Sequence, residues 1–367
     1  MENWLESNDP DLSGIDVDVS EPVLVTGASG YVAGWIVKGL LDAGCTVHAC
    51  VRDPNDAIKT AHLTAMADAA PGRLRLFATD LLDEGSYAAA MEGCGVVIHT
   101  ASPFTRNVTD PRRQLIDPAL RGTRNVLASV EATLSVRRVV VTSSVAAMYT
   151  DNVECARSTG GTLSEEAWNR TASPDYEPYA YAKTLAEKAA WDACELQREP
   201  RRWRLVSINP ALVVGPYAGG APTSDSFAIM RMLIDGTARF GVPRVGIGLV
   251  DVRDVARAHI AAAFLPGARG RYLICGRDTD MATVGKVLGP RYGATFPLPK
   301  RALPKPLLRI VGPAFGLSRR YVAGNVNHAF RSTARRSREE LKMVYRPYRV
   351  SLEDMVSQMA PSVLVEA

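Results

Sequence analysis

The order in which apolar runs and helical stretches follow one another constrains this chain more than any other feature. Short runs rich in Val, Ile and Leu alternate with amphipathic stretches over the first two thirds of the sequence. Continuous apolar runs are typical of strands covered on both faces, and their alternation with helices is typical of a parallel sheet. Because crossovers between parallel strands are almost always right-handed, the pattern predicts an α/β fold with a Rossmann-type, doubly wound parallel sheet.

The predicted elements can be placed along the chain. We expect strands at residues 23–25, 46–51, 74–77, 96–99, 138–142 and 205–209. We expect helices at residues 31–43, 56–69, 84–92, 113–133 and 179–198. After residue 210 clusters of Gly and Pro break the alternation, which indicates a smaller C-terminal lobe. Ligands of open α/β sheets bind at the carboxyl ends of the strands, so this lobe is expected to shape the substrate pocket.

A small-residue loop lies between the first predicted strand and the first predicted helix. Gly27 permits a tight turn, Gly30 lets the backbone approach a pyrophosphate, and Ala33 allows close packing of helix on strand. The N-terminus of the helix adds unpaired N–H groups and the positive end of its dipole. The loop therefore predicts a dinucleotide site, and the residues assigned to it are Gly27, Ser29, Gly30, Tyr31 and Val32.

The end of the second predicted strand indicates which dinucleotide is bound. An acidic residue at this position accepts hydrogen bonds from the ribose 2′-hydroxyl of NAD. Here the residue is Arg52, and Lys59 follows seven positions later. A guanidinium matches a 2′-phosphate in both geometry and charge, so the sequence predicts NADP(H) as the cofactor.

These observations suggest a division of the chain. Residues 1–20 are expected to form a mobile acidic tail, because seven acids and no Lys or Arg precede residue 22. Residues 21–210, with about 247–268, are expected to form the NADP-binding Rossmann domain, and residues 211–246 and 269–360 the substrate-binding lobe. The acidic start differs from the basic and apolar start of a secretory signal, so a cytoplasmic location is predicted. Neither the six cysteines nor the five histidines have metal-ligand spacing, so no metal is expected.

A phenol and an ammonium group supply the predicted catalytic chemistry. Tyr179 and Lys183 lie four residues apart, which places both on one face of a helix. A phenol with a pKa of about 10 is a poor acid near neutrality, and a neighbouring ammonium is expected to lower that pKa. Tyr179 could then protonate a developing alkoxide. Ser144 follows the fifth predicted strand at its carboxyl end, where its hydroxyl could bind the same substrate oxygen.

With these motifs in this order, the chain resembles the extended short-chain dehydrogenase/reductases. Within them it is most similar to the group of dihydroflavonol reductases, cinnamoyl-CoA reductases and yeast-type aldehyde/ketone reductases. The matching stretches are residues 25–41, 50–54, 79–83, 99–103, 138–144, 179–191, 209–216 and 250–258, with further likeness in 330–341. The resemblance implies that Lys183 also binds the nicotinamide ribose and that the nicotinamide C4 delivers hydride to a carbonyl carbon. It further implies cofactor contacts from Asp80, Leu81, Thr100, Ala101, Ser102, Pro210 and Val213.

The chain departs from the group in two places that bear on the substrate. Ala147, Met148 and Tyr149 stand in the region where dihydroflavonol reductases carry an Asn that reads the flavonoid. Residues 175–178 replace the Asn-Trp-Tyr signature of cinnamoyl-CoA reductases. Both differences favour a general aldehyde or ketone reductase over a flavonoid or hydroxycinnamoyl-CoA reductase.

Two other functions remain open on the sequence. The first is a 3β-hydroxysteroid dehydrogenase or a nucleotide-sugar epimerase/dehydratase of the same fold, although Arg52 argues against the NAD that epimerases retain. The second is a non-catalytic NADP sensor.

We expect the protein to bind a small carbonyl substrate and no nucleic acid, to make no stable membrane insertion, and to be a monomer or homodimer. Fourteen Lys or Arg between Arg291 and Arg349 face only two acids, and residues 303–320 are expected to be a solvated wall of the lobe.

Overall fold

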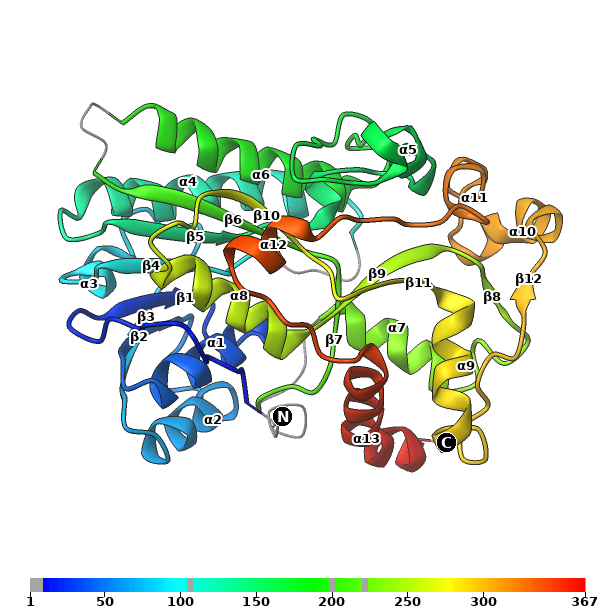
Figure 1. Cartoon of the computed structure of the whole chain (residues 1–367), viewed down its shortest axis with the longest axis horizontal. Coiled ribbons are helices and arrows are strands. Elements are labelled where there is room, and N and C mark those ends of the chain that lie inside the picture. The colour runs from blue at the N-terminus through cyan, green and yellow to red at the C-terminus, as the bar shows by residue number, and fades with distance from the viewer. Residues whose placement is uncertain (1–8, 104–107, 198–201, 220–223, 367) are drawn as a thin grey trace.

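A seven-stranded parallel sheet forms the centre of the molecule (Figure 1). The computed structural model describes residues 9–103, 108–197, 202–219 and 224–366. In spatial order the strands are β10 (Gly270–Ile274), β6 (Arg204–Pro210), β5 (Arg138–Thr142), β4 (Val96–His99), β1 (Val23–Thr26), β2 (Thr46–Val51) and β3 (Arg73–Ala78). The chain order reverses beside β1, which pairs with β2 on one side and β4 on the other. This reversal opens a crevice at the carboxyl ends of the strands, where α/β proteins bind ligands.

Successive side chains of each strand enter two separate cores, because the pleat directs them to opposite faces. Val23 and Val25 of β1 pack with helices α1 (Tyr31–Asp42) and α8 (Val252–Phe264), whereas Leu24 packs on the other face. Helices α3 (Ala88–Met91), α4 (Asp117–Ala132) and α6 (Pro178–Glu195) cover that second face. A further helix, α2 (Ala57–Asp68), packs beside α1. Burial on both faces explains why the strands read as unbroken apolar runs.

The smaller lobe is built from two short sheets and several helices (Figure 1). One sheet holds β11 (Arg277–Asp280), β9 (Gly246–Asp251) and β7 (Leu212–Val214), and the other holds β12 (Ala302–Leu303) and β8 (Val242–Pro243). The helices are α5 (Asn152–Arg157), α7 (Asp225–Ile234), α9 (Met281–Tyr292), α10 (Lys305–Val311), α11 (Arg319–Asn325), α12 (Arg335–Glu340) and α13 (Tyr348–Glu366). In the described part of the chain, no helix is both long enough and apolar enough to cross a membrane.

The structure confirms the predicted fold class and differs in several elements. The six predicted strands are present within one residue at either end, and the helix expected at 84–92 is reduced to α3. Residues 270–274, assigned from the sequence to the smaller lobe, form the edge strand β10 of the large sheet. Conversely, β9 pairs with strands of the lobe. Both differences arise from long-range strand pairing, which local sequence patterns do not encode.

Residues 9–20, expected to be a mobile tail, lie against the folded protein. The backbone carbonyls of Asp11 and Ser13 accept hydrogen bonds from Arg257 on α8, and Lys38 on α1 pairs with Asp9 at 3.0 Å. Apolar side chains of this segment also pack on the main core. The prediction of a mobile tail did not account for these cations, because they lie more than twenty residues away in the sequence. Residues 1–8 lie outside the described residues.

Candidate active site

The loop between β1 and α1 has the geometry of a phosphate cradle. Gly27 has a φ of +63°, a left-handed conformation that favours glycine, and a Cβ there would lie 3.1 Å from Ala101. Gly30 is the N-cap of α1, and the helical ladder begins with the bond from Gly34 N–H to Gly30 O at 2.8 Å. The backbone N–H groups of Tyr31, Val32 and Ala33 therefore have no partner within the helix. Such donors suit a pyrophosphate, so the loop fits the predicted dinucleotide.

The side chain of Tyr31 does not face this loop. Its ring is buried against Phe227 at a centroid distance of 4.9 Å, and its hydroxyl donates to Gly215 O at 2.6 Å. Trp35, one turn further along α1, donates to Pro216 O at 2.8 Å. Tyr31 can therefore serve the cofactor only through its backbone N–H, while its side chain joins the phosphate loop to the smaller lobe. Ser29 lies half-buried at the turn itself.

The cations predicted to choose the cofactor lie at the carboxyl end of β2. Arg52 directly follows the strand and is exposed. Asp53 is engaged in a local turn, where its carboxylate accepts from Asn55 N–H at 2.9 Å. Lys59 pairs with Asp56 at 2.9 Å and is 72% exposed. Arg52 is therefore the better placed of the two cations to meet a phosphate at the strand end, because a carboxylate on its own helix already neutralises Lys59.

Hydrogen bonds connect the end of β1 to the end of β4, where cofactor-binding residues were predicted. The Thr26 hydroxyl accepts hydrogen bonds from the N–H groups of Thr100 at 3.1 Å and Ala101 at 3.0 Å. It also lies 2.8 Å from Nδ1 of His99, a buried imidazole. Burial, and then the charge of Lys183, lower the pKa of His99 to about 3. The ring is therefore neutral and can accept the proton of the Thr26 hydroxyl.

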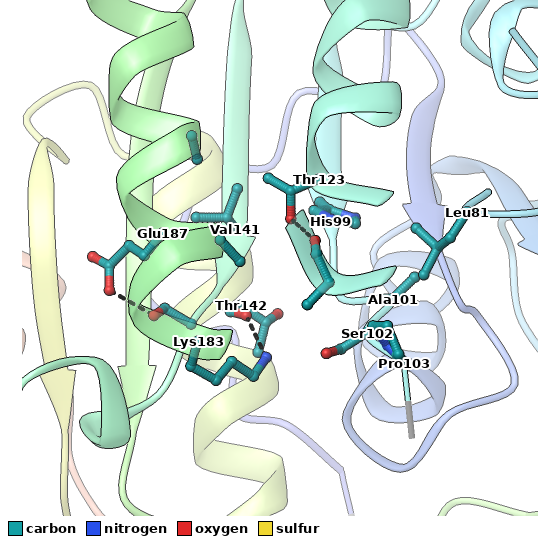
Figure 2. Close-up of a pocket in the computed structure, with 14 residues that line it drawn as sticks. Leu81, His99, Ala101, Ser102, Pro103, Thr123, Val141, Thr142, Lys183 and Glu187 are labelled. Atoms are coloured by element: carbon teal, nitrogen blue, oxygen red, sulfur yellow. Dashed lines mark hydrogen bonds between the residues drawn. The ribbon is translucent and has the colours of Figure 1, made fainter. Parts of the chain in front are cut away.

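Lys183 opens onto a pocket between α4, α6 and the ends of β4 and β5 (Figure 2). Its ammonium group donates to the carbonyl of Thr142 at 3.3 Å. Burial lowers the pKa of Lys183 to about 8, while the charge of Glu187 opposes this decrease.

The lining of this pocket combines Lys183 with three of the predicted cofactor residues, Leu81, Ala101 and Ser102. The remaining predicted contacts lie around the crevice: Asp80 is exposed beyond β3, Pro210 is buried at the end of β6, and Val213 is half-buried in β7.

Tyr179 and Ser144 meet at the mouth of the site. Ser144 lies two residues beyond β5 as the N-cap of a 3-10 turn, where its side chain accepts from Ala146 N–H at 3.1 Å. It also forms a side-chain hydrogen bond with Tyr179, which lies in the first turn of α6. The structure therefore brings together the predicted acid and the predicted hydroxyl donor. Tyr179 is 47% exposed, which leaves the phenol accessible to a substrate.

The pKa of Tyr179 differs from the sequence expectation. Although the residue is partly exposed, desolvation by the surrounding protein raises this pKa above its ordinary value, and the charge of Asp225 on α7 raises it further. The hydrogen bond from Ser144 acts in the opposite direction. Lys183 was expected to lower the pKa of Tyr179, but its ammonium group is turned toward the Thr142 carbonyl. The phenol of this structure is therefore a proton donor, with its proton held at neutral pH.

Sequence reasoning missed a buried carboxylate one turn beyond Lys183. Glu187 is 2% exposed and accepts hydrogen bonds from Ser143 at 2.6 Å and Asn209 at 2.8 Å. Arg271 of β10 pairs with it at 2.6 Å. Burial alone would raise the pKa of Glu187, but Arg271 and these hydrogen bonds keep it below its ordinary value. The i, i+4 spacing from Lys183 was visible in the sequence, whereas its partners on β5, β6 and β10 were not.

Comparisons with known proteins agree with this arrangement. Residues 23–275 match the model of the NAD dependent epimerase/dehydratase family, which spans more than half of the chain. The chain belongs to this family. Its members include the extended short-chain dehydrogenase/reductases that the sequence motifs had indicated, so the predicted family is confirmed.

Three relatives of this epimerase/dehydratase family member are reductases. A cinnamoyl-CoA reductase of Medicago truncatula is 42% identical over 74% of this chain and 80% of its own length. An anthocyanidin reductase of Vitis vinifera is 34% identical over 73% of this chain and 80% of its own. The crystal structure of the yeast methylglyoxal/isovaleraldehyde reductase Gre2 with NADPH has a TM-score of 0.75 at 25% identity, and covers 93% of this chain and 98% of that one.

Proposed function

We propose that this chain is an NADPH-dependent reductase that converts an aldehyde or ketone to an alcohol. The observation that carries the proposal is the meeting of Tyr179 with Ser144 beside Lys183, at the carboxyl edge of the parallel sheet. The expectation of an NADP-dependent oxidoreductase is confirmed by its relatives, which are reductases and include one solved with NADPH. The roles of the individual residues below are our proposal.

The cofactor is held by three parts of the crevice. The N–H groups at the start of α1 hold the pyrophosphate, with Gly27 and Gly30 allowing the close approach. Arg52 binds the 2′-phosphate, since its guanidinium lies exposed at the end of β2. Lys183 binds the nicotinamide ribose, and Leu81, Asp80, Thr100, Ala101, Ser102, Pro210 and Val213 line the remainder of the site. When bound, NADPH supplies the hydride for reduction.

Three side chains act on the substrate oxygen and its proton. Ser144 donates a hydrogen bond to the carbonyl oxygen and stabilises the negative charge that develops there. Tyr179 donates its proton to the same oxygen, and its raised pKa keeps that proton in place until the charge develops. Lys183, whose ammonium here faces the Thr142 carbonyl, turns toward Tyr179 as the phenolate forms and stabilises it, since the two residues lie one helical turn apart on α6.

The substrate enters from the side of the smaller lobe. We propose that residues 211–246 and 269–360, apart from β10, shape its pocket, and that Asp225 borders it because its charge acts on Tyr179. A second candidate is reduction of an aromatic acyl-CoA, favoured by the 42% identity to a cinnamoyl-CoA reductase. Against it, the segment before the catalytic pair is engaged internally: Tyr176 donates to Asp151 at 2.7 Å, and Arg320 stacks on its ring.

Oxidation of NADPH, followed by absorbance, tests the function directly. The substrate panel contains methylglyoxal, isovaleraldehyde, an α-ketoester, a diketone, an aryl ketone and cinnamoyl-CoA. We expect turnover with members of the aldehyde and ketone group and little with cinnamoyl-CoA. A preference for the thioester would establish the second candidate, and oxidation with none of the compounds would refute the reductase. A UDP-sugar and a 3β-hydroxysteroid with NAD test the remaining alternatives of the same fold.

We further propose that the enzyme acts in the cytoplasm as a monomer or homodimer. All six cysteines are buried thiols, as expected in a reducing compartment.

Residues 303–320 expose Leu307, Ile310 and Phe315 among cations, and we propose that this segment forms a solvated wall of the smaller lobe. In co-sedimentation with anionic vesicles at physiological salt, the protein should stay in the supernatant, since isolated apolar side chains bury little area. Light scattering decides the oligomeric state, and pelleting with the vesicles would contradict the solvated wall.

A further inference from the structure

Helix α6 carries a third polar side chain on the face that bears Tyr179 and Lys183. Glu187 follows Lys183 by four residues, so the phenol, the ammonium and the carboxylate occupy successive turns. Figure 2 shows Lys183 and Glu187 on α6, with the Lys183 side chain ending beside Thr142. Both line the same pocket. A carboxylate this deeply buried is rare in proteins unless it is paired, so its position calls for a physical reason.

The carboxylate of Glu187 joins the ends of the strands that carry the site. One oxygen accepts hydrogen bonds from Ser143 on the β5 end at 2.6 Å and from Asn209 on β6 at 2.8 Å. The same Asn209 amide donates to the backbone carbonyl of Ser144 at 3.1 Å. Residues 142–144 are therefore fixed from α6 and β6 together. This segment presents both the Ser144 hydroxyl and the Thr142 carbonyl that accepts from Lys183.

The other oxygen of Glu187 balances its charge. It accepts from Nε of Arg271 at 2.6 Å, and the guanidinium of Arg271 stacks on Trp168 at 3.9 Å from the ring centroid. Arg271 also donates to the carbonyl of Glu165 at 2.9 Å. Both members of the Glu187–Arg271 pair thus have hydrogen-bond partners beyond each other, and the carboxylate stays ionised in the interior. Among the charged groups near Lys183, Glu187 favours the charged ammonium, whereas the neutral His99 has no charge to oppose it.

We propose that Glu187 is a positioning residue for this reaction, which keeps Lys183 protonated and fixes the Ser143–Ser144 strand end. The assignment rests on the proposed reductase function, because it acts through Lys183 and Ser144. In water a lysine needs no such support, but burial disfavours its charge. Glu187 supplies the compensating charge from one turn below, while Arg271 keeps that carboxylate from being neutralised.

The charge effect can be measured without turnover. The neutral amine of Lys183 reacts with acetic anhydride and the ammonium does not, so mass spectrometry of its peptide across a pH series gives a titration midpoint. Glu187→Gln should lower this midpoint by about one pH unit, since an opposite charge has been removed. Glu195→Gln is the matched control: it removes the same charge from an exposed position on the same helix and should leave the midpoint unchanged.

Two further variants keep the test decisive. Glu187→Gln leaves Arg271 without a charged partner and could unfold the protein, whereas Glu187→Gln with Arg271→Gln leaves no unpaired buried charge. The double variant should also show a lower midpoint, with a smaller decrease than the single variant, because loss of the Arg271 cation offsets part of the lost Glu187 charge. Ser143→Ala removes one hydrogen bond and no charge, so it should lower kcat at every pH while the midpoint stays in place. Midpoints equal to the wild-type value in both Glu187 variants would overturn the proposal.

Steady-state rates then separate this proposal from the proposed function. With NADPH and isovaleraldehyde, Glu187→Gln should lose activity at a lower pH than the wild type, and be about tenfold slower above both midpoints. A wild-type protein that oxidises no NADPH with any carbonyl, yet shows the shifted labelling midpoint, would refute the reductase and leave the effect of Glu187 on Lys183 intact. An unshifted midpoint in an active enzyme would do the reverse.

Discussion

Single side chains in this site work through their surroundings more than through their intrinsic chemistry. The phenol of Tyr179 holds its proton because the surrounding protein desolvates its charged form and the charge of Asp225 acts in the same direction, whereas the hydrogen bond from Ser144 lowers the pKa. The ammonium of Lys183 is easily lost because it is buried, and Glu187 moderates that. The pKa values of the two proposed catalytic groups are thus shifted in opposite directions by the same physical cause, which is desolvation of their charged forms.

Removal of the Tyr179 hydroxyl should separate catalysis from binding. Tyr179→Phe removes the proton donor and leaves the ring volume nearly unchanged, so kcat should fall by at least about 10²-fold. Fluorescence titration should show that NADPH still binds. Lys183→Ala should damage both rate and NADPH affinity, and Ser144→Ala mainly the rate. A Tyr179→Phe variant with near-normal turnover on a good substrate would remove Tyr179 from the mechanism.

The pH dependence of reduction should have an alkaline limb set by Lys183. Its pKa of about 8 means that the ammonium is present below this pH and is lost above it. Carbonyl reduction should therefore be constant from pH 6 to about 7.5 and decline tenfold per unit well above pH 8. Tyr179, with its pKa above the ordinary value, keeps its proton through this range. A rate that stays constant to pH 10 would contradict the role of Lys183.

The groups of the proposed site lie at or near the ends of secondary-structure elements. The carboxyl ends of β1, β2, β4 and β5 and the N-terminus of α1 meet at the crevice. The helix α6 spans the site lengthwise and contributes one side chain per turn. Because Arg52 follows a strand end and Gly30 is a helix N-cap, the proposed contacts with the 2′-phosphate and with the pyrophosphate come from two independent elements. Cofactor preference can therefore be changed without disturbing the catalytic helix.

Arg52 should determine the preference for NADPH over NADH. Its guanidinium offers charge-assisted hydrogen bonds to the 2′-phosphate, which NADH lacks. Arg52→Asp should move kcat/KM toward NADH by removing that attraction and by offering a carboxylate to the ribose hydroxyls. Lys59→Ala should have a smaller effect, since Lys59 already pairs with Asp56. Equal kcat/KM values for NADPH and NADH in the unmodified enzyme would contradict this assignment.

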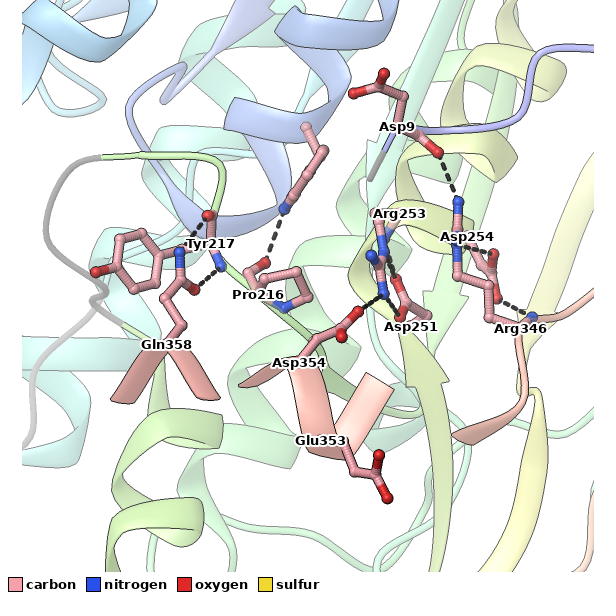
Figure 3. A network of polar contacts seen from close by, with 12 residues as sticks. Asp9, Pro216, Tyr217, Asp251, Arg253, Asp254, Arg346, Glu353, Asp354 and Gln358 are labelled. Carbon is pink, nitrogen blue, oxygen red and sulfur yellow. Dashed lines mark hydrogen bonds and ion pairs between the residues drawn. The ribbon is translucent and has the colours of Figure 1, made fainter. Parts of the chain in front are cut away.

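The two lobes are joined by a buried polar network that runs to the C-terminal helix (Figure 3). Arg253 at the start of α8 lies between Asp251 at 2.7 Å and Asp354 of α13 at 2.8 Å. Gln358, one turn further along α13, exchanges two hydrogen bonds with the backbone of Tyr217. Through residues 215–217 this contact continues to Tyr31 and the phosphate-loop helix. The last helix of the chain thus supports the first nucleotide-binding element.

Loss of Arg253 should destabilise the whole molecule. Arg253→Met leaves the buried carboxylate of Asp251 without its partner, which costs about 3–5 kcal/mol of unfolding free energy. Asp354→Asn is the control: Asp354 is 33% exposed, so its loss should cost no more than about 1 kcal/mol. Urea unfolding followed by circular dichroism measures both. Equal and small losses in the two variants would show that the network does not hold α13 in place.

The sequence alone determined the parallel sheet, the glycine loop between β1 and α1, and the position of Tyr179 and Lys183 one turn apart on a helix. These features are local: a strand, a turn or a helical face is encoded within about ten consecutive residues, so periodicity and spacing predict it. Other features were decided only by the tertiary structure. Arg271 reaches Glu187 because β10 adds to the sheet edge beside β6, and the charge of Asp225 at the start of α7 acts on Tyr179. Such contacts join residues far apart in the chain, and the burial they create shifts the pKa values of Tyr179 and Lys183.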